Sequence, residues 1–380
     1  MTRIRIRPTE PVIGIDASRL SIAQRTGTET YTWETLRALA ALNEPDAIRL
    51  YLNADALPPE ADFPWDIRAI PFPRFWTHAR LSIEMAVHPP AVLWVPAHVV
   101  PLNHPRSVVT VHDLGYLHVP EGHTARQRRM LDSTTRWSVR AASHVIAISQ
   151  TTKRDLIERY HVEPGTITVI PHGVNANLVR SDDANIAETI ARFQITCPFI
   201  LTVGTVQPRK NYDGLARALD AIKSAGLPHQ LVIAGKRGWL ADKVDEAINA
   251  SGNAERIQQL GYVSDQDLAA LYAAADLMVF PSWYEGFGLP ALEAMQSGTP
   301  VIASNRGALP EAIGKAGLIV DPGDEAALGR AMVRVLTDDA LRRQLIAEGY
   351  DRASEFTWER TARMTLEVLR NQRDETFPRK

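Results

Sequence analysis

Residues 281–304 read PSWYEGFGLPALEAMQSGTPVIAS, which we interpret as a strand end, a glycine-rich loop, a helix, a turn and a second strand. Pro290 suits the first turn of that helix, where a missing N–H costs little, and Ser297-Gly298 suits its end. The backbone N–H groups of residues 286–289 and the positive end of the helix would then face a shared ligand. This segment therefore predicts a site for a phosphate or diphosphate.

Short Val- and Ile-rich runs alternate with helical stretches along the whole chain, which predicts parallel α/β sheets. A first series of strands is expected at residues 12–15, 48–52, 67–70, 92–95, 108–111, 144–148 and 167–170. A second series is expected at residues 199–203, 230–234, 257–260, 277–280, 301–303 and 318–320. Because 380 residues exceed the usual size of a single core, we expect two Rossmann-like, doubly wound parallel-sheet domains that face a cleft.

The domain boundaries follow from the gap between the two series of strands. Residues 1–178 would form the N-terminal domain and residues 179–355 the C-terminal domain. The polar stretch 179–195 has no strand and would serve as the linker and the entry to the second domain. Residues 356–380 would begin with a closing helix that has one apolar face, formed by Trp358, Met364, Leu366 and Leu369.

Composition and charge narrow the class of protein. The formal net charge of −2 gives no overall attraction to nucleic acid, so we expect no nucleic-acid partner. Cys197 is the only cysteine, which excludes a disulfide framework and a cysteine-based zinc site and favours a reducing compartment. The N-terminus lacks the apolar region of a signal peptide, and the run 89–102 is too short and too rich in proline to span a membrane. We therefore expect a cytoplasmic protein.

Two acids flank the predicted anion site. Glu285 precedes the glycine-rich loop, and Glu293 lies in the first turns of the helix. Carboxylates are poor phosphate ligands, but they accept hydrogen bonds from hydroxyl groups on either side of a diphosphate. A nucleotide sugar has this layout, with a sugar at one end and a ribose at the other. The alternative is that Glu293 is an ordinary acid favoured by the helix dipole and Glu285 a solvated loop acid.

The spacing Glu285-x7-Glu293 within EGFGLPALEAMQSGTPVIAS resembles the signature of the retaining family 4 glycosyltransferases, which have the glycosyltransferase-B fold. The resemblance implies that Glu285 contacts the transferred sugar and that Glu293 binds the ribose. It assigns the diphosphate to the backbone of Gly286, Phe287, Gly288 and Leu289. A glutamate beside the ribose disfavours glycosidase chemistry, which needs two carboxylates at the scissile bond. In this family the N-terminal domain lies on the acceptor side, the C-terminal domain binds the nucleotide sugar, and the closing helix crosses back to the first domain.

The segment LTVGTVQPRKN, residues 201–211, brings two adjacent cations to a strand end. Arg209 and Lys210 would neutralise the charge on a departing nucleoside diphosphate. The alternative is a solvated basic turn. Members of the family more often carry an arginine directly after the glycine, where this chain has Thr205, so only Lys210 is in register. We expect Arg209 to supply the missing charge.

Two positions in the first half of the chain would also face the substrates. Gly27 in RTGTETY lies at a junction between a loop and a helix, with Thr28 as a candidate N-cap. The resemblance makes Gly27 a backbone contact near the diphosphate and the acceptor, and a plain helix start is the alternative. His112 and Asp113 follow a strand in VVTVHDLGY. The family places a comparable histidine near the transferred sugar, so we expect His112 to orient the donor or the acceptor; Asp113 binds beside it or is a turn residue.

Other strand ends complete the expected cleft. Gly261, Tyr262 and Val263 occupy the place where backbone groups of the family meet the nucleobase, and a simple strand end is an equal alternative. Ser149 is expected to cap a helix, and the segment His172-Gly173-Val174-Asn175 to form a structural junction. His118 and His123 lie near His112 in the sequence, but no helical histidine pair or neighbouring cysteine supports a metal site. We therefore expect no metal.

Two stretches combine aromatic and basic side chains, Phe72–Met85 and His123–Arg140. Such faces could approach lipid headgroups or a lipid-linked glycan, in peripheral contact with the inner face of a membrane. Buried helices with solvated arginines are the interpretation that we prefer.

The resemblance implies the transfer of a glycosyl group from a nucleotide sugar to a hydroxyl of a glycan or lipid-linked acceptor, with retained configuration and without a metal or other cofactor. The variant TVQPRKN is most similar to bacterial mannosyltransferases that build surface polysaccharide, so GDP-mannose is the expected donor. The alternatives are a nucleotide-sugar 2-epimerase, which needs no acceptor, and a non-catalytic nucleotide-binding module. We also expect Glu285→Ala to abolish transfer and to leave the fold intact. The oligomeric state is left open.

Overall fold

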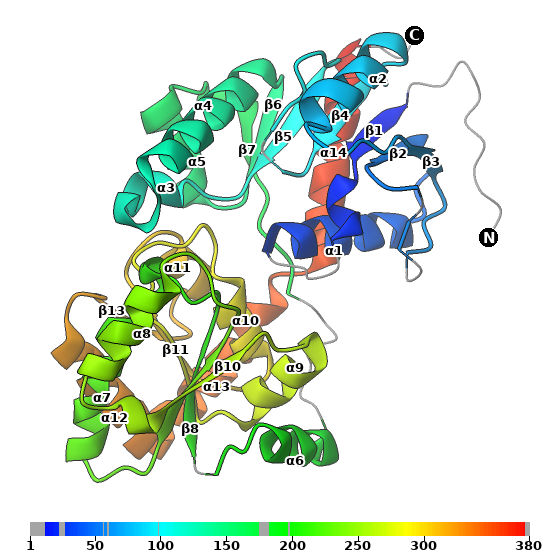
Figure 1. Ribbon diagram of the computed structural model, residues 1–380. Coiled ribbons are helices and arrows are strands. Elements are labelled where there is room, and N and C mark those ends of the chain that lie inside the picture. Colours follow the sequence, from blue (N-terminus) through cyan, green and yellow to red (C-terminus); the bar gives the residue numbers. More distant parts are fainter. Residues whose placement is uncertain are drawn as a thin grey trace. The chain divides into compact units, whose positions relative to one another are not determined.

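The computed structural model describes residues 12–22, 27–55, 57–58, 61–97, 99–174, 182–196 and 198–376, and Figure 1 shows the path of the chain. Asn175 and Cys197 therefore lie outside the described residues. The chain divides into two compact units. The first unit contains the described residues up to Asp113, the segment Arg129–Gly173 and the residues from Trp358 onward. The second unit contains Leu114–Arg128 and Val174–Thr357.

The first unit is built on a parallel sheet of seven strands, with the order β3-β2-β1-β4-β5-β6-β7 among the described residues. The strands are β1 (Ile13–Asp16), β2 (Ile48–Leu52), β3 (Asp66–Ala69), β4 (Val92–Val95), β5 (Ser107–Val111), β6 (His144–Ala147) and β7 (Ile167–Val169). In register, Ile13 of β1 pairs with Ile48 on one side and with Val92 on the other. β4 and β5 are buried along their whole length, because the inner strands of a parallel sheet are covered on both faces.

Helices and short helical turns connect these strands. The longer helices of the first unit are α1 (Gly27–Ala41), α2 (Ser82–Val87), α5 (Gln150–Tyr160) and α14 (Trp358–Thr376), together with most of α4 (Ala125–Ala141). The shorter turns are η1 (Ser18–Ser21), the π-helical turn η2 (Thr77–Leu81) and η4 (Pro164–Thr166). Ser149 caps α5 as expected, because its hydroxyl accepts a hydrogen bond from the backbone N–H of Thr152. Thr28 lies inside α1 and is not its cap, so that expectation is wrong.

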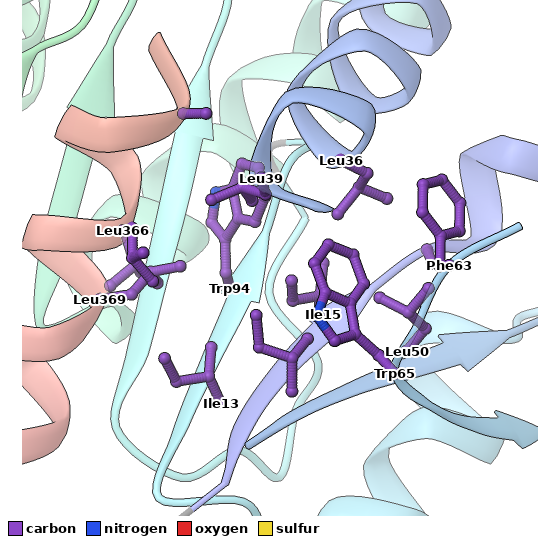
Figure 2. Close-up of a cluster of buried hydrophobic side chains, with 14 of the residues drawn as sticks. Ile13, Ile15, Leu36, Leu39, Leu50, Phe63, Trp65, Trp94, Leu366 and Leu369 are labelled. Carbon is purple, nitrogen blue, oxygen red and sulfur yellow. The ribbon is translucent and has the colours of Figure 1, made fainter. Parts of the chain in front are cut away.

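The core of the first unit includes the C-terminal helix. Figure 2 shows Leu366 and Leu369 of α14 alongside the strands that carry Ile13 and Trp94, and all four side chains are buried. Trp358 is buried in the same cluster and Met364 is partly buried against it, so the predicted apolar face is confirmed. Outside the apolar cluster, Asp46 holds α14 by accepting hydrogen bonds from Arg370 at 2.5 Å and from Arg373 at 2.6 Å.

The second unit repeats the architecture with six parallel strands, in the order β10-β9-β8-β11-β12-β13 within the described residues. The strands are β8 (Phe199–Val203), β9 (Gln230–Ala234), β10 (Ile257–Gly261), β11 (Leu277–Phe280), β12 (Val301–Ser304) and β13 (Leu318–Val320). The longer helices are α6 (Asp183–Arg192), α7 (Tyr212–Ser224), α8 (Ala241–Ala250), α9 (Asp265–Ala274), α10 (Leu289–Gln296), α12 (Glu325–Thr337) and α13 (Asp339–Ser354). The shorter ones are α3 (Gly115–His118), η3 (Pro120–Gly122), η6 (Pro208–Lys210), η7 (Ala254–Arg256) and α11 (Leu309–Ile313).

Both sheets have the strand order of doubly wound α/β proteins, which confirms the predicted fold class. Each predicted strand is present, and its ends differ from the prediction by at most one residue. The stretch 179–195 was expected to be the linker and the entry to the second domain, and its described part, residues 182–195, belongs to the second unit. It contains α6, which Asp182 caps and which is tied to α9 by an ion pair between Arg192 and Asp267.

The strand order fixes where each unit can bind a ligand. In the first sheet β2 and β4 lie on opposite sides of β1, and in the second sheet β9 and β11 lie on opposite sides of β8. The connections on either side of such a switch point diverge and leave a crevice beyond the carboxyl ends of the strands. Residues that follow β1 and β4, or β8 and β11, are therefore the first candidates for ligand contacts.

Candidate functional site

The glycine-rich loop and the helix α10 follow β11 at the switch point of the second sheet. Gly288 is the N-cap of α10, Pro290 lies in its first turn, and Ser297 is its C-cap, followed by Gly298. The predicted loop, helix and turn are therefore confirmed. Because the first N–H groups of a helix have no partner within it, the segment Gly286–Leu289 offers donors and a positive helix end to an anion.

Glu285, at the start of this loop, is held by both predicted cations. Its Oε1 accepts a hydrogen bond from Lys210 Nζ at 2.8 Å, and its Oε2 lies 3.0 Å from Arg209 Nη1. Glu285 is only 8% exposed and Lys210 only 6%. Glu285 is therefore not a solvated loop acid, and Arg209 and Lys210 do not form a solvated basic turn. One negative and two positive charges leave the cluster with a net charge of +1.

The pKa of Glu285 reflects two opposing effects. Burial alone would raise this pKa, but the positive charges of Arg209 and Lys210 outweigh burial and lower the pKa from 4.5 to about 2. Glu285 is therefore a carboxylate at every pH near neutrality. It can accept hydrogen bonds or stabilise positive charge, and it cannot act as a general acid.

The position of Lys210 depends on Gly204, the residue that follows β8. Gly204 has a φ of +147°, and a Cβ there would lie 2.9 Å from Cε of Lys210 and 3.0 Å from its Nζ. The absence of a side chain therefore makes room for the end of the lysine. The ammonium group also lies 4.6 Å from the ring centroid of Phe280, a favourable cation–π distance.

Backbone contacts tie the loop before Glu285 to the turn that carries the cations. Arg209 Nη1 donates to the carbonyl oxygen of Tyr284 at 2.5 Å, and the N–H of Trp283 donates to the carbonyl oxygen of Arg209 at 2.9 Å. Thr205, at the place of the family's usual arginine, packs against Gly238 instead. The second positive charge beside Glu285 therefore belongs to Arg209. Thr205, at the position of the family's usual arginine, contributes none.

Gly307, in the loop after β12, supports the backbone of Glu285. Its φ is +60°, and a Cβ there would lie 2.4 Å from the carbonyl oxygen of Glu285 and 2.7 Å from its nitrogen. The N–H of Ala308 donates to the same carbonyl oxygen at 2.9 Å. The sequence signal for this role was weak, because a polar segment with a glycine follows several other strands of this chain.

Glu293 has a different environment, although it is also 8% exposed. Tyr272 of α9 donates a hydrogen bond to Glu293 Oε2 at 2.9 Å. Burial raises the pKa of Glu293 to about 7, and the hydrogen bond from Tyr272 only partly offsets this effect. An ordinary helix acid would be ionised and solvated, so that alternative does not fit. The role of Tyr272 was missed, because a tyrosine at helical spacing has no distinctive sequence signal.

The ends of β9 and β10 form the other side of the second sheet. Gly261 ends β10, and its carbonyl oxygen accepts a hydrogen bond from the N–H of Gly235 at 2.8 Å. Tyr262 is exposed, whereas Val263 is buried. The three residues are thus placed at a strand end next to β9, as both sequence interpretations require.

The remaining predicted residues, Gly27, His112 and Asp113, belong to the first unit. Gly27 begins α1, and His112 and Asp113 directly follow β5. His112 Nε2 lies 2.8 Å from the carbonyl oxygen of Pro96. Because a carbonyl oxygen only accepts, Nε2 carries the hydrogen, and a neutral His112 has its acceptor at Nδ1.

The ring of His112 also packs in an aromatic cluster of the first unit. The ring of Tyr31 meets it edge-on with centroids 4.9 Å apart, and the ring of His172 stacks against both Tyr31 and Trp358, which also contact each other. Burial and the neighbouring His112 lower the pKa of His172 well below its usual value. His172 is therefore a packed neutral residue, as expected for a structural junction.

No group of three or more His, Cys, Asp or Glu side chains in the described residues is placed to hold a metal ion. No helix in the described part of the chain has the length and the apolar character needed to cross a membrane.

The raised pKa of Glu293 predicts a pH-dependent stability. The folded state binds this proton more tightly than the unfolded chain, so the free energy of unfolding falls as the pH rises from 4.5 to about 7. Glu293→Gln keeps an acceptor for Tyr272 and should remove this loss, which amounts to roughly 3 kcal/mol if the whole shift is realised. Urea unfolding of both proteins at pH 5 and pH 8 measures the effect. The exposed Glu246→Gln on α8 is the control, and parallel pH profiles of wild type and Glu293→Gln would contradict the assignment.

The ion cluster predicts that Glu285→Ala lowers the stability of the fold, an effect that the sequence-based expectation did not include. It leaves the buried Lys210 without a counter-charge, which should lower the free energy of unfolding by about 3 kcal/mol. Adding Lys210→Met should restore at least half of this loss, because the orphaned charge is then removed. Denaturant unfolding of both single variants and the double variant gives the coupling. Strictly additive effects would show that the two side chains do not interact.

Comparisons with known proteins agree on one family. Residues 185–352 match the model described as glycosyl transferases group 1, and residues 25–178 match that of glycosyltransferase family 4. The O-antigen chain mannosyltransferase B of Escherichia coli is 30% identical over 365 residues, which cover 91% of this chain and 96% of that protein. A D-inositol 3-phosphate glycosyltransferase of Salinispora tropica is 36% identical over 249 residues, which cover 60% of this chain and 51% of that protein.

Solved structures share the fold at lower sequence identity. Sucrose-phosphate synthase from Thermosynechococcus elongatus has a TM-score of 0.74 and 24% identity, with 95% of this chain and 98% of that chain covered. WaaG, a glycosyltransferase involved in lipopolysaccharide biosynthesis, has a TM-score of 0.71 and 17% identity, with 97% and 100% covered. Together with the match to the Escherichia coli protein over most of both chains, these findings establish that the chain is a glycosyltransferase of family 4 with the glycosyltransferase-B fold.

Proposed function

We propose that the chain transfers a hexosyl group, with mannosyl favoured, from a nucleotide sugar to a hydroxyl of a glycan or lipid-linked acceptor. Transfer would retain the configuration and serve the synthesis of a cell-surface polysaccharide. The observation that carries the proposal is the cluster of Glu285, Arg209 and Lys210 before the N-terminus of α10. The mannosyl group and the polysaccharide product are suggested by the Escherichia coli relative, an O-antigen chain mannosyltransferase. GDP-mannose is the first donor to test.

The cluster suits a reaction in which a nucleoside diphosphate departs. Negative charge develops on the diphosphate as its bond to the sugar breaks, and fixed positive groups stabilise it without reorganisation. Arg209, Lys210 and the first N–H groups of α10 provide such groups within one unit. They can carry the charge that a divalent cation carries elsewhere, so we propose a metal-independent reaction with no cofactor.

Glu285 would act on the sugar and not on the leaving group. Its pKa of about 2 keeps it ionised, so it can accept hydrogen bonds from sugar hydroxyls and stabilise positive charge that develops at the anomeric carbon. The same pKa argues against a glycosidase, which needs a protonated carboxyl to protonate the leaving oxygen.

Retention follows if the acceptor attacks from the face on which the diphosphate departs. The bond between the anomeric carbon and the phosphate oxygen breaks, the acceptor oxygen forms the new bond, and its proton passes to the departing phosphate. No side chain needs to take the proton in this scheme. His112, whose Nε2–H donates to the carbonyl oxygen of Pro96, would orient hydroxyls near the sugar.

The exposed face of α4 supports contact with a lipid-linked acceptor at the inner face of the membrane. Met130 and Trp137 are exposed among the arginines of this helix, and this exposure supports such a contact over the alternative of a buried helix with solvated arginines. A basic helix with exposed apolar side chains suits an anionic lipid surface. We therefore place the reaction in the cytoplasm, next to that surface.

The charge of Glu285 should be required for transfer. Glu285→Gln keeps the size of the side chain and an acceptor for Lys210, but it removes the negative charge, so we expect transfer to fall by about 10²-fold or more. The assay measures nucleoside diphosphate release from GDP-mannose, UDP-glucose and other nucleotide sugars, with and without a mannan acceptor. Glu246→Gln is the control and should turn over like the wild type. Wild-type turnover in Glu285→Gln would contradict the proposal. An isomerised donor without an acceptor would instead support the epimerase, and binding without turnover the non-catalytic module.

Donor binding should depend on the ionisation of Glu293. Ribose hydroxyls donate hydrogen bonds to a carboxylate, so binding favours the ionised form and releases the proton that the free protein holds below about pH 7. The donor Michaelis constant of the wild type should therefore fall between pH 6 and pH 8. Glu293→Gln should raise this constant at pH 8 and flatten its pH dependence. An unchanged constant at both pH values in the variant would contradict the ribose role.

A further inference from the structure

Asn211 directly follows the two cations of the cluster, and its side chain ties their turn to another loop of the second unit. The short turn η6 ends with Arg209 and Lys210. Asn211 is 1% exposed, and its Nδ2 donates a hydrogen bond to the carbonyl oxygen of Pro322 at 2.8 Å. Pro322 lies in the loop after β13. This hydrogen bond therefore holds the end of the turn against a distant part of the chain.

The backbone of Asn211 also has an unusual conformation. Its φ is +56°, which lies in the left-handed region that asparagine adopts more readily than most residues. Its carbonyl oxygen accepts a hydrogen bond from the N–H of Leu215 at 3.1 Å, in the first turn of α7. The conformation of this one residue thus sets the angle at which η6 joins α7, and with it the direction in which Lys210 leaves the backbone.

An ordinary helix cap is the alternative role for Asn211. Asparagine is common at this position because its side-chain oxygen accepts a hydrogen bond from the second or third N–H group of a helix. Asn211 is the N-cap residue of α7, but its side chain makes no such bond to the described residues 212–214. A Cβ at Gly214 would lie only 2.5 Å from Oδ1 of Asn211, so the carboxamide is closely held. Capping therefore does not account for this side chain, whereas the hydrogen bond to Pro322 does.

The loop that accepts this hydrogen bond is braced by its neighbours. Asp321 accepts hydrogen bonds from the N–H of Gly323 at 2.9 Å and from Nη2 of Arg306 at 2.9 Å. Arg306 directly precedes Gly307, whose close approach supports the backbone of Glu285. The cations and the carboxylate of the cluster are therefore held by the same group of loops.

We propose that Asn211 is a positioning residue for Lys210. Through Pro322 it fixes the backbone from which the ammonium group reaches Glu285, because a long side chain keeps one position only if its backbone is fixed. The inference deepens the proposed function and rests on it for the rate. If Lys210 stabilises the departing diphosphate, a displaced ammonium group slows transfer. Asn211 does not touch the donor in this proposal and is not a catalytic residue.

A thermodynamic cycle tests the positioning without any substrate. The coupling between Glu285→Ala and Lys210→Met is measured by urea unfolding, once in the wild-type chain and once in a chain that carries Asn211→Gly. Glycine adopts left-handed backbone without strain, so this variant should fold and lack the carboxamide alone. We expect the coupling to fall by at least half in the Asn211→Gly chain, because the ammonium group no longer keeps its place. A purely structural Asn211 would lower the stability of every variant equally, and an unchanged coupling would overturn the inference.

Asn253→Gly is the matched control. Asn253 is fully buried in the same unit, and its Nδ2 also donates to a backbone carbonyl oxygen, that of Ala216 at 3.0 Å. Its loss should lower the stability and leave the coupling between Glu285 and Lys210 unchanged. An equal fall of the coupling in both glycine variants would show that the effect is not specific to Asn211 and would overturn the inference.

Transfer kinetics supply the second measurement. Asn211→Gly should lower kcat about tenfold and change the donor Michaelis constant by less than twofold, because the displaced cation matters most where negative charge develops. Asn253→Gly should keep the kcat of the wild type. Equal kcat values for Asn211→Gly and an active wild type would overturn the inference. If the wild type turns over no nucleotide sugar but the coupling falls in Asn211→Gly, the proposed function fails and the positioning of Lys210 stands.

Discussion

The buried carboxylate of Glu285 is the constraint around which the second unit is arranged. A carboxylate with so little exposure would lose its charge unless positive groups lay close to it. Arg209 and Lys210 meet this need from a turn 75 residues earlier in the chain, and they reach Glu285 because β8 and β11 are neighbours in the sheet. The lysine needs the space at Gly204, and the backbone of Glu285 needs the close approach of Gly307. Strand order, two glycines and three charges thus depend on one another.

Two glutamates of equal exposure differ by about five pKa units because their neighbours differ. Glu285 faces two cations and has a pKa of about 2, whereas Glu293 has only the hydroxyl of Tyr272 and a pKa of about 7. The first is permanently charged and suits a site where charge develops during the reaction. Glu293 can lose its proton when a ligand donates hydrogen bonds to it. This behaviour suits the recognition of ribose hydroxyls. Their chemistry is set by their surroundings and not by their residue type.

Local features of the sequence were sufficient to predict the strands and the loop before α10. Buried parallel strands are short runs of β-branched residues, such as those of β4 and β5. Such runs can be recognised from the sequence alone. The helix α6 was missed because a surface helix with a polar face resembles a linker in composition. The pairing of Glu285 with Lys210, the hydrogen bond from Tyr272 and that from Asn211 to Pro322 could not be predicted from local patterns. Each joins residues far apart in the chain, and only the strand order brings them together.

The switch point of the second sheet is distinguished by its charge, and this charge bears on the ligand that we propose for it. The crevice of the second sheet has a helix N-terminus and a net positive cluster, which suit the diphosphate of a donor. Glu285 compensates one of the two cations, so a neutral ligand in this crevice would leave the remaining net charge of +1 without a counter-ion. An anionic ligand would compensate that charge and would also accept hydrogen bonds from the first N–H groups of α10. The electrostatic character of the crevice, and not the fold alone, therefore limits the ligands that it can take.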